Sequence, residues 1–328
     1  SEESNPIYAR FMGEKYIVTK SKMKGVRLLG KSGEWKIYEN ESAASIIYGT
    51  SQVMSEKNYD KLEYPYNQTT LLQKAVVPES ATKQTDSIEA VDNLHNAVLQ
   101  FGENSCISET DGGYHIFAKK NTKVKAEIVS QIDINSVNTV NTENAGENTN
   151  VANETKTDSG NRVLLLRFKV KNLKPSKDLT IWVDGNRNKQ RVYYNDNTTF
   201  TYAVALEGDE NQVEVTFSKG KYNLSDVEAY IATLPGTELY ESEFLQNSTK
   251  TKGNVIAGNL TMQKSGYLIT SIPYDSGFQI QVDGKNVKSE KVNTAFLGCK
   301  MKAGEHDIVI TYHAPGMAAG KVMSFVGM

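Results

Sequence analysis

The sequence is poor in cysteine, in excess basic charge and in long apolar runs. Its two cysteines, Cys106 and Cys299, stand far apart, so neither a disulfide framework nor a metal motif is indicated, and both are predicted to be small buried residues. Lysine and arginine together number 37 against 39 acidic residues, which gives a formal net charge of -2. This balance lacks the basic footprint of a nucleic-acid-binding protein, so nucleic acid is not an expected partner.

Motifs of catalysis and cofactor binding are also missing. The sequence has no Gly-rich phosphate loop, no nucleophile elbow and no His-Glu-x-x-His. We therefore expect no cofactor, no metal and no catalytic residue in this chain, and no enzyme activity of its own. No apolar run reaches the roughly 18 residues of a membrane span. The tail from 317 to 328 nevertheless becomes apolar, which predicts an adjoining membrane helix.

The composition that is present predicts a folded chain of two or three domains. Apolar residues make up 38% of the 328 positions, which is enough to build real cores. Residues 1–86 are expected to form a small α/β segment. Short β-branched and aromatic runs at 15–19, 35–38 and 44–48 predict strands, and apolar residues at helical spacing predict a helix over 67–77, capped by Asn67.

The rest of the sequence predicts a mainly β fold with two β-sandwich modules that resemble jelly rolls. Between 87 and 238, many short alternating runs are bounded by turn residues, as in a sandwich. Within this range, residues 135–160 are rich in Asn, Thr and Glu without periodicity and predict a long exposed loop. A smaller C-terminal sandwich is expected over 239–328.

The two modules share a repeated pattern. Residues 179–186 and 278–285 are each an alternating strand that ends in Asp-Gly, and each is followed by an aromatic strand, a Gly-bearing turn and a last alternating strand. Asp-Gly suits a primed hairpin turn, because both residues accept positive φ there. We expect the two hairpins to be equivalent. The predicted inward positions are Ile181, Val183, Val213 and Val215 in the first module, and Ile280, Val282, Phe296, Ile308 and Ile310 in the second.

The last module also carries a longer signature. It has a Pro-Tyr-Asp-x-Gly-aromatic entry, a Val-Asp-Gly turn, an Asn-x-Ala-Phe strand and a Gly-x-His-x-Ile strand. The marked positions are Pro273, Tyr274, Asp275, Gly277, Asp283, Gly284, Phe296, Gly304 and His306. This string resembles the C-terminal region of the YfhO family of bacterial membrane proteins, and a weaker resemblance covers residues 15–77. Structural roles are expected: Asp283 serves its turn, Tyr274 and Asp275 pin the loop before the strand, and His306 bonds a neighbouring loop rather than acting as a ligand or catalyst.

The resemblance implies a parent protein with many transmembrane helices. Such a parent is similar to the lipid-phosphosugar-dependent glycosyltransferases that decorate Gram-positive cell-wall polymers such as lipoteichoic acid. Their catalytic carboxylates sit in loops of the membrane block, which this chain does not contain, so no catalytic residue carries over. The resemblance also implies a place on the extracellular face of the cell membrane. The expected partners are the membrane block of the same polypeptide and a cell-wall glycopolymer.

Four aromatic residues around the first Asp-Gly hairpin are candidates for carbohydrate binding: Trp182, Tyr193, Tyr194 and Tyr202. Exposed rings can stack on the apolar face of a sugar, although alternating strands bury half of their side chains. Trp182 is expected on the outer face of its strand. The alternative is a purely structural or protein-interaction domain. A groove with two or more exposed aromatics beside Asn, Asp or Arg favours sugar binding, and a flat polar surface favours the alternative.

Overall fold

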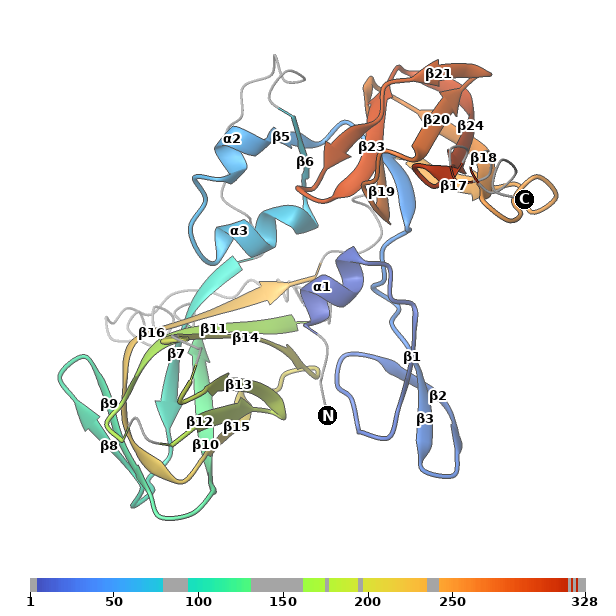
Figure 1. Ribbon diagram of the computed structural model, residues 1–328. Coiled ribbons are helices and arrows are strands. Elements are labelled where there is room, and N and C mark those ends of the chain that lie inside the picture. Colours follow the sequence, from blue (N-terminus) through green and yellow to red (C-terminus); the bar gives the residue numbers. More distant parts are fainter. Residues whose placement is uncertain are drawn as a thin grey trace, which may run out of the picture. The chain divides into compact units, whose positions relative to one another are not determined.

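The computed structural model describes residues 5–78, 94–130, 162–174, 177–193, 197–234, 242–317, 320 and 323, and these are mainly β (Figure 1). Large antiparallel sheets dominate, which confirms the fold class expected from the sequence. The loop expected at 135–160 and the end of the apolar tail lie outside the described residues. No helix in the described ranges is long and apolar enough to cross a membrane.

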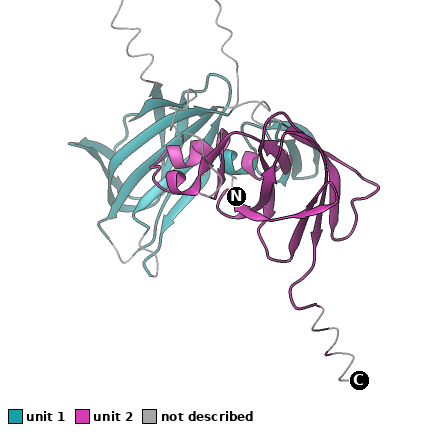
Figure 2. Cartoon of the chain, turned by 90° about the horizontal axis from the view of Figure 1, so that it is seen from above, with its two compact units in different colours: residues 1–9, 16–42, 92–234 teal, residues 10–15, 43–91, 235–328 magenta. Residues whose placement is uncertain are grey.

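The chain divides into two compact units (Figure 2). Unit 1 comprises residues 1–9, 16–42 and 92–234, and unit 2 comprises residues 10–15, 43–91 and 235–328. Residues 1–86, expected as one α/β segment, therefore contribute to both units. To unit 1 they give a three-stranded antiparallel sheet in the order β1 (Tyr16–Thr19), β3 (Trp35–Glu39), β2 (Arg27–Ser32). A short helix, α1 (Pro6–Phe11), precedes it in the chain.

Unit 1 is built around one large antiparallel sheet. Its strand order is β13 (Asn186–Gln190), β12 (Leu179–Val183), β15 (Gln212–Phe217), β10 (Thr122–Ser130), β7 (Leu94–Phe101), β16 (Gly220–Thr233), β11 (Arg162–Asn172) and β14 (Thr199–Leu206). β9 (Gly113–Ala118) pairs with β16, and β8 (Ile107–Thr110) pairs with β9. Strands such as β15 alternate, so Val213 and Val215 are buried while Gln212 and Glu214 are exposed.

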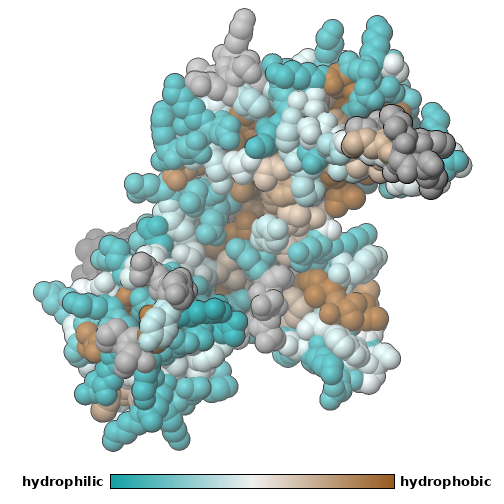
Figure 3. Space-filling model, viewed as in Figure 1, coloured by the Kyte–Doolittle hydropathy of each residue, from teal (hydrophilic) through white to brown (hydrophobic). Residues whose placement is uncertain are grey.

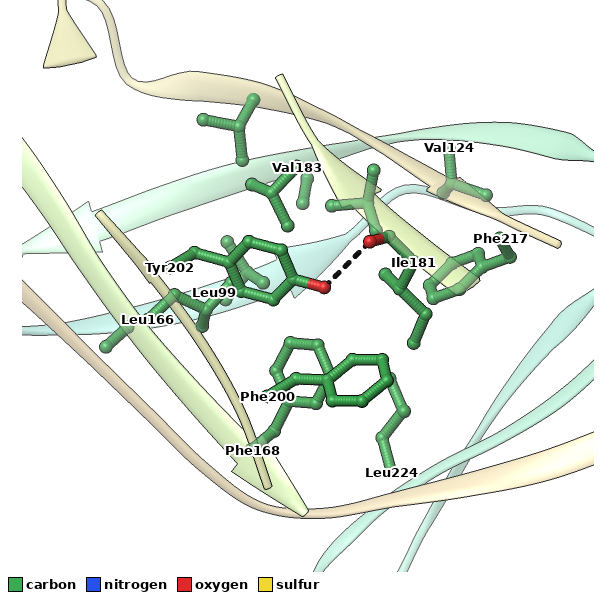
Figure 4. Packing of buried hydrophobic residues seen from close by; sticks show 14 of the residues in the cluster. Leu99, Val124, Leu166, Phe168, Ile181, Val183, Phe200, Tyr202, Phe217 and Leu224 are labelled. Carbon is green, nitrogen blue, oxygen red and sulfur yellow. Dashed lines mark hydrogen bonds between the residues drawn. The ribbon is translucent and has the colours of Figure 1, made fainter. Parts of the chain in front are cut away.

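The two ends of this sheet meet over its core. Tyr202 of β14 donates its hydroxyl to the carbonyl of Ile181 in β12 at 2.9 Å (Figure 4). The side-chain amide of Asn188 in β13 likewise donates to the carbonyl of Thr201 at 2.8 Å. Between these ends, the ring of Phe168 lies 6.1 Å from that of Phe200 and 5.7 Å from that of Tyr202. The sheet therefore encloses an aromatic and aliphatic core.

Unit 2 contains a second antiparallel sheet. Its strand order is β21 (Lys285–Val287), β20 (Phe278–Val282), β24 (Gly304–Tyr312), β18 (Val255–Met262), β17 (Ser242–Gln246), β4 (Ile47–Thr50), β19 (Gly266–Pro273), β23 (Phe296–Met301) and β22 (Glu290–Val292). Ile280 and Ile308 are fully buried in its core, and Val282 packs against that core while partly exposed. The small elements α2 (Glu56–Tyr59), α3 (Tyr66–Thr69), β5 (Val53–Ser55) and β6 (Ala75–Val77) also belong to unit 2.

The two sheets share one strand order. The path β13-β12-β15-β10-β7-β16-β11-β14 corresponds, strand for strand, to β21-β20-β24-β18-β17-β4-β19-β23. Seven of these eight pairs also follow the same order along the chain. The eighth differs: β16 follows the other strands of its sheet in sequence, whereas its counterpart β4 precedes the others of its own. The hairpins at Asp184 and Asp283 are therefore equivalent, as the repeated pattern predicted.

Both hairpins use the turn that the sequence predicted. The φ angles are 45° at Asp184 and 85° at Gly185 in the first, and 52° at Asp283 and 72° at Gly284 in the second. Positive φ at both central residues defines the primed turn whose twist matches that of the flanking strands.

The expected inward position of Phe296 is wrong. Leu297 is the residue of β23 that is buried in the core with Ile280. Phe296 is half-buried on the opposite face, where it packs beside Val292 and lies edge-on to Phe11 with ring centres 5.4 Å apart. Neighbouring strand residues point to opposite faces, so a register error of one residue reversed the assignment.

The helix expected over 67–77 is also wrong in its second half. α3 ends at Thr69, a 3₁₀ turn covers Thr70–Leu72, and Ala75–Val77 form β6, which pairs in parallel with β5. Pro65 rather than Asn67 occupies the cap position. The consecutive Val76 and Val77 suit a strand, and their burial against the sheet of unit 2 overrides the helical spacing of the apolar residues.

Candidate functional site

A cleft lined by lysines lies in unit 1 and has a volume of about 300 Å³. The lysine side chains around it come from Lys119, Lys174, Lys177, Lys219 and Lys221. Its floor is made by Ala118, Leu179 and Tyr222, which are all buried. We call this feature the basic cleft. Its volume is at the lower end of the range typical of small-ligand sites.

Three neighbouring strands bring these lysines together. β9 pairs with β16 so that Phe117 lies opposite Lys221, and β16 pairs with β11 so that Tyr222 lies opposite Asn172. The loop after β11 is held by the side chain of Asn172, which donates to the carbonyl of Lys177 and accepts from the N–H of Lys174, both at 2.9 Å. The lysines of three separate chain segments therefore converge where these strands begin or end.

The basic cleft carries positive charge that is not neutralised locally. Across the described ranges, none of its five lysines has an acidic group within ion-pair distance. The lining carboxylate, Asp178, is paired instead with Lys189 at 2.7 Å and accepts the N–H of Val192 at 2.9 Å. These hydrogen bonds lower the pKa of Asp178 below its ordinary value of 3.8. The site is thus suited to an anion.

An aromatic residue and a buried hydroxyl complete the basic cleft. Phe117 is 49% exposed, and the amine of Lys221 lies 4.5 Å from the centre of its ring, a cation–π contact. Burial raises the pKa of Tyr222, whose hydroxyl donates to the carbonyl of Ser218 at 3.1 Å. The cleft therefore offers ammonium groups above a floor of buried side chains.

The four aromatics expected to bind sugar do not form one platform. Tyr202 is 3% exposed, because β14 turns alternate side chains into the core, so it cannot present its ring to a ligand. Trp182 is half-buried on the outer face of β12. Tyr193 is 76% exposed and follows Val192, which bonds the cleft residue Asp178. Tyr194 lies outside the described residues.

Sequence reasoning missed the basic cleft for a physical reason. Its lysines come from around 119, from 174–177 and from 219–221, segments that are distant in the chain and unremarkable in a sequence with 37 basic residues. Only the pairing of β9, β16 and β11 brings them together. The pairs Lys174 with Lys177 and Lys219 with Lys221 were the available local signal.

The signature residues that precede β20 form a pinned loop in unit 2. Pro273 ends β19, and the N–H of Tyr274 donates to the carbonyl of Ala295 at 2.9 Å. The carboxylate of Asp275 accepts the N–H of Gly277 at 2.7 Å. A side chain at Gly277 would collide with the carbonyl of His313, which explains a glycine there.

The signature residues of the later hairpin tie its turn to β24. Nδ1 of His306 lies 2.8 Å from a carboxylate oxygen of Asp283, and its Nε2 lies 3.1 Å from the carbonyl of Lys302. Gly304 adopts a φ of 125°, which favours glycine. Within the described part of the chain, no group of three His, Cys, Asp or Glu could hold a metal ion. These contacts tie the Asp283–Gly284 turn to β24 and to the carbonyl of Lys302.

A second, smaller cavity of about 120 Å³ lies beside residues 22–26 in unit 1. Lys24 donates to Asp184 at 2.7 Å and to Glu210 at 2.6 Å. Burial alone would lower the pKa of Lys24, but these two bonds outweigh it and raise the pKa above its ordinary value of 10.5. The positive charge of Lys24 is already paired with these two carboxylates, so we do not assign an anion site to this cavity. It lies where residues 22–26 pack against the large sheet of unit 1.

The fold and the basic cleft define a class of protein: a β-rich chain with two modules of one strand order and a cleft lined by lysines. The chain belongs to the YfhO family, since the family model for bacterial membrane protein YfhO matches residues 4–324. An uncharacterized protein YfhO of Bacillus subtilis (strain 168) is 22% identical over 310 residues. That match covers 90% of this chain and 34% of the relative, so the chain spans about a third of the relative's length.

Solved structures give weaker likenesses. The arabinofuranosyltransferase AftD from Mycobacteria is 13% identical with a TM-score of 0.20, over 44% of this chain and 12% of that chain. Latent PorU from Porphyromonas gingivalis is 11% identical with a TM-score of 0.22, over 88% of this chain and 27% of that chain. Similarity at this level carries no argument about function.

Proposed function

We propose that this chain is the extracytoplasmic accessory part of a YfhO-family membrane glycosyltransferase that decorates a cell-wall polymer such as lipoteichoic acid. In this proposal, the chain holds the polymer in the basic cleft, while catalysis belongs to the membrane block of the same polypeptide. Family membership and the resemblance of the C-terminal signature support the parent enzyme.

The observation that carries the binding role is the set of five lysines around a cleft of about 300 Å³, none of them paired with a carboxylate in the described ranges. Teichoic acids carry a phosphodiester in each repeat, so their chain is a polyanion. Lysine binds phosphate as a flexible point charge, which suits a repeating polymer whose units must slide through a site. The chain as a whole has a net charge of -2, so the attraction of a polyanion to the cleft comes from this local group of lysines and not from the overall charge.

Sugar stacking has a minor part in this proposal. Among the described residues that line the basic cleft, Phe117 has an exposed aromatic ring. The exposed Tyr193 follows Val192 in the chain, and the N–H of Val192 donates to the lining residue Asp178. Electrostatic attraction to phosphate therefore supplies most of the affinity. The alternative is a structural or protein-interaction module, for which the cleft would bind no polymer.

The test is the affinity for a fluorescent glycerol-phosphate oligomer, measured by anisotropy at several salt concentrations. The test variant carries Lys174→Gln, Lys177→Gln and Lys219→Gln, and the matched control carries Lys264→Gln, Lys285→Gln and Lys300→Gln, three exposed lysines of unit 2. We expect the test variant to lose about tenfold or more in affinity and to show a shallower salt dependence, by about one in the log–log slope per lost contact. Equal affinities of the two variants would refute polymer binding in this cleft.

A further inference from the structure

The three-stranded sheet of unit 1 exposes an unusual number of large apolar side chains. Tyr16 and Val18 are each 60% exposed, Trp35 is 49% exposed and Ile37 is 38% exposed. The neighbouring Leu28 and Leu29, at a bulge in β2, are 43% and 46% exposed. Figure 3 shows hydrophobic colour gathered over this sheet. A contiguous exposed apolar patch on a protein surface marks an interaction site.

The register places four of these side chains on one face of the sheet. Val18 lies directly opposite Ile37 in the β1–β3 pair. Tyr16 lies two residues before Val18, and Trp35 lies two residues before Ile37. Because alternate residues of a strand point to the same face, Tyr16 and Trp35 lie on the face that carries Val18 and Ile37. We call Tyr16, Val18, Trp35 and Ile37 the apolar face.

The opposite face of the same sheet is already used for packing. Ile17 lies opposite Tyr38, which is 4% exposed. The Tyr38 hydroxyl accepts the N–H of Met23, and the adjacent Lys24 binds Asp184 of the large sheet. A sheet with one face packed is expected to carry polar residues on the other. The apolar face breaks that rule, and the exposed apolar surface of Val18, Trp35 and Ile37 is available for contact with another surface.

Charge around the apolar face indicates which partner. Residues 14–41 contain seven Lys or Arg against four Glu, and six against four when Lys24, which is paired with Asp184 and Glu210, is left out, while the whole chain carries -2. The amine of Lys20 lies 5.2 Å from the centre of the Trp35 ring. Trp and Tyr flanked by Lys and Arg are typical of surfaces that lie in the interface of a bilayer, where the rings enter the headgroup region and the cations remain with anionic lipid.

We infer that the apolar face rests on the surface of an anionic lipid bilayer. The chain belongs to a membrane protein family. In a chain that is linked to a membrane, the apolar face would meet lipid at a high effective concentration. A patch of few side chains then suffices, since each basic residue near an anionic leaflet adds to the affinity. This contact would fix how unit 1 lies against the membrane, and it is independent of polymer binding in the basic cleft.

Trp35 gives a direct readout of this contact. The chain has two tryptophans, so Trp182→Phe leaves Trp35 as the reporter. Vesicles of phosphatidylglycerol and phosphatidylcholine are expected to shift its emission to the blue, and brominated lipid is expected to quench it. Pure phosphatidylcholine vesicles are expected to bind at least tenfold more weakly. No shift and no sedimentation with either vesicle would overturn the inference.

A matched set of variants separates the apolar face from other surfaces. Val18→Ser with Ile37→Ser, both at exposed positions, is expected to weaken vesicle binding at least tenfold with an unchanged melting temperature. Leu245→Ser, at a leucine of unit 2 that is 64% exposed, is the control and should bind as the parent chain does. The lysine variant of the basic cleft should also keep vesicle binding. Vesicle binding that the double serine variant retains would overturn the inference. A second outcome would also overturn it: a parent chain that forms a dimer and does not bind vesicles, and that the double serine variant converts to a monomer.

Discussion

Asp184 and Asp283 make the same two hydrogen bonds in two different sheets. The N–H of Asp184 donates to the carbonyl of Glu214 at 2.9 Å, and its carboxylate accepts the N–H of Glu214 at 2.7 Å. Asp283 repeats both bonds with Asp307, each at 2.9 Å. Only the partner of the second carboxylate oxygen differs: it is Lys24 for Asp184 and His306 for Asp283. Each aspartate therefore shapes its turn and ties the hairpin to the neighbouring strand, β15 in unit 1 and β24 in unit 2.

Removal of the Asp184 carboxylate is expected to destabilise unit 1. Asp184→Ala leaves the N–H of Glu214 and the amine of Lys24 without this acceptor, and it places alanine at a φ of 45°. We expect a loss of about 1–3 kcal/mol in the free energy of unfolding, measured in urea. Asp283→Ala should cost unit 2 less, because the Asp283 side chain is 52% exposed against 10% for Asp184.

Asparagine is the matched control at both positions. It keeps a side-chain acceptor and tolerates positive φ, so Asp184→Asn and Asp283→Asn should each cost less than the alanine change. Equal losses for asparagine and alanine at Asp184 would show that the bond to Glu214 does not stabilise the turn.

Asp283 should also contribute a defined pH dependence. The hydrogen bond from His306, followed by that from the N–H of Asp307, holds the pKa of the Asp283 carboxyl below its ordinary value of 3.8. Because the folded pKa lies below the unfolded one, this group stabilises the fold fully above about pH 5 and loses that contribution as the pH falls through the folded value. The stability difference between the parent chain and Asp283→Asn should therefore shrink as the pH falls below 3.8. A difference that persists unchanged to lower pH would contradict the shift.

The two cysteines should be inert in the folded chain. Burial, followed by the nearby charge of Glu290, raises the pKa of Cys299 to about 12, and burial also raises the pKa of Cys106. A thiol reagent at mildly alkaline pH is expected to label neither thiol before unfolding and both in denaturant, since the thiolate is the reactive form. Cys106→Ala should reduce the number of thiols labelled in denaturant from two to one. Rapid labelling of the native chain would show that a thiol is accessible.

Local patterns were enough to predict most of the fold. Alternating runs located the strands at 179–183 and 278–282, and Asp-Gly located their turns, because a strand period of two and a positive φ are properties of a few neighbouring residues. The same information could not place β4, whose pairing with β17 joins Gly49 to Ser242. No local signal links residues so far apart in the chain.

Burial of ring side chains was the weak point of the site prediction. Tyr202 and Trp182 both stand in strands beside the same turn, yet one is in the core and the other is half-buried on the outer face. Aromatic type does not distinguish these positions, since a ring can fill a core or bind a ligand. The basic cleft needed pairing of three distant segments, and the apolar face needed knowledge of which side of a small sheet is packed.

Position 297 offers the sharpest test of the corrected register in unit 2. Leu297 is fully buried beside Ile280, so Leu297→Ala should lower the free energy of unfolding of unit 2 by about 2–5 kcal/mol through lost burial and the cavity left behind. Leu245→Ala, the same change at a side chain that is 64% exposed, should stay within about 0.5 kcal/mol of the parent chain. Urea unfolding followed by circular dichroism compares the two. Similar effects of both changes would mean that β23 turns the opposite face toward the core, with Phe296 inward as the sequence pattern had indicated.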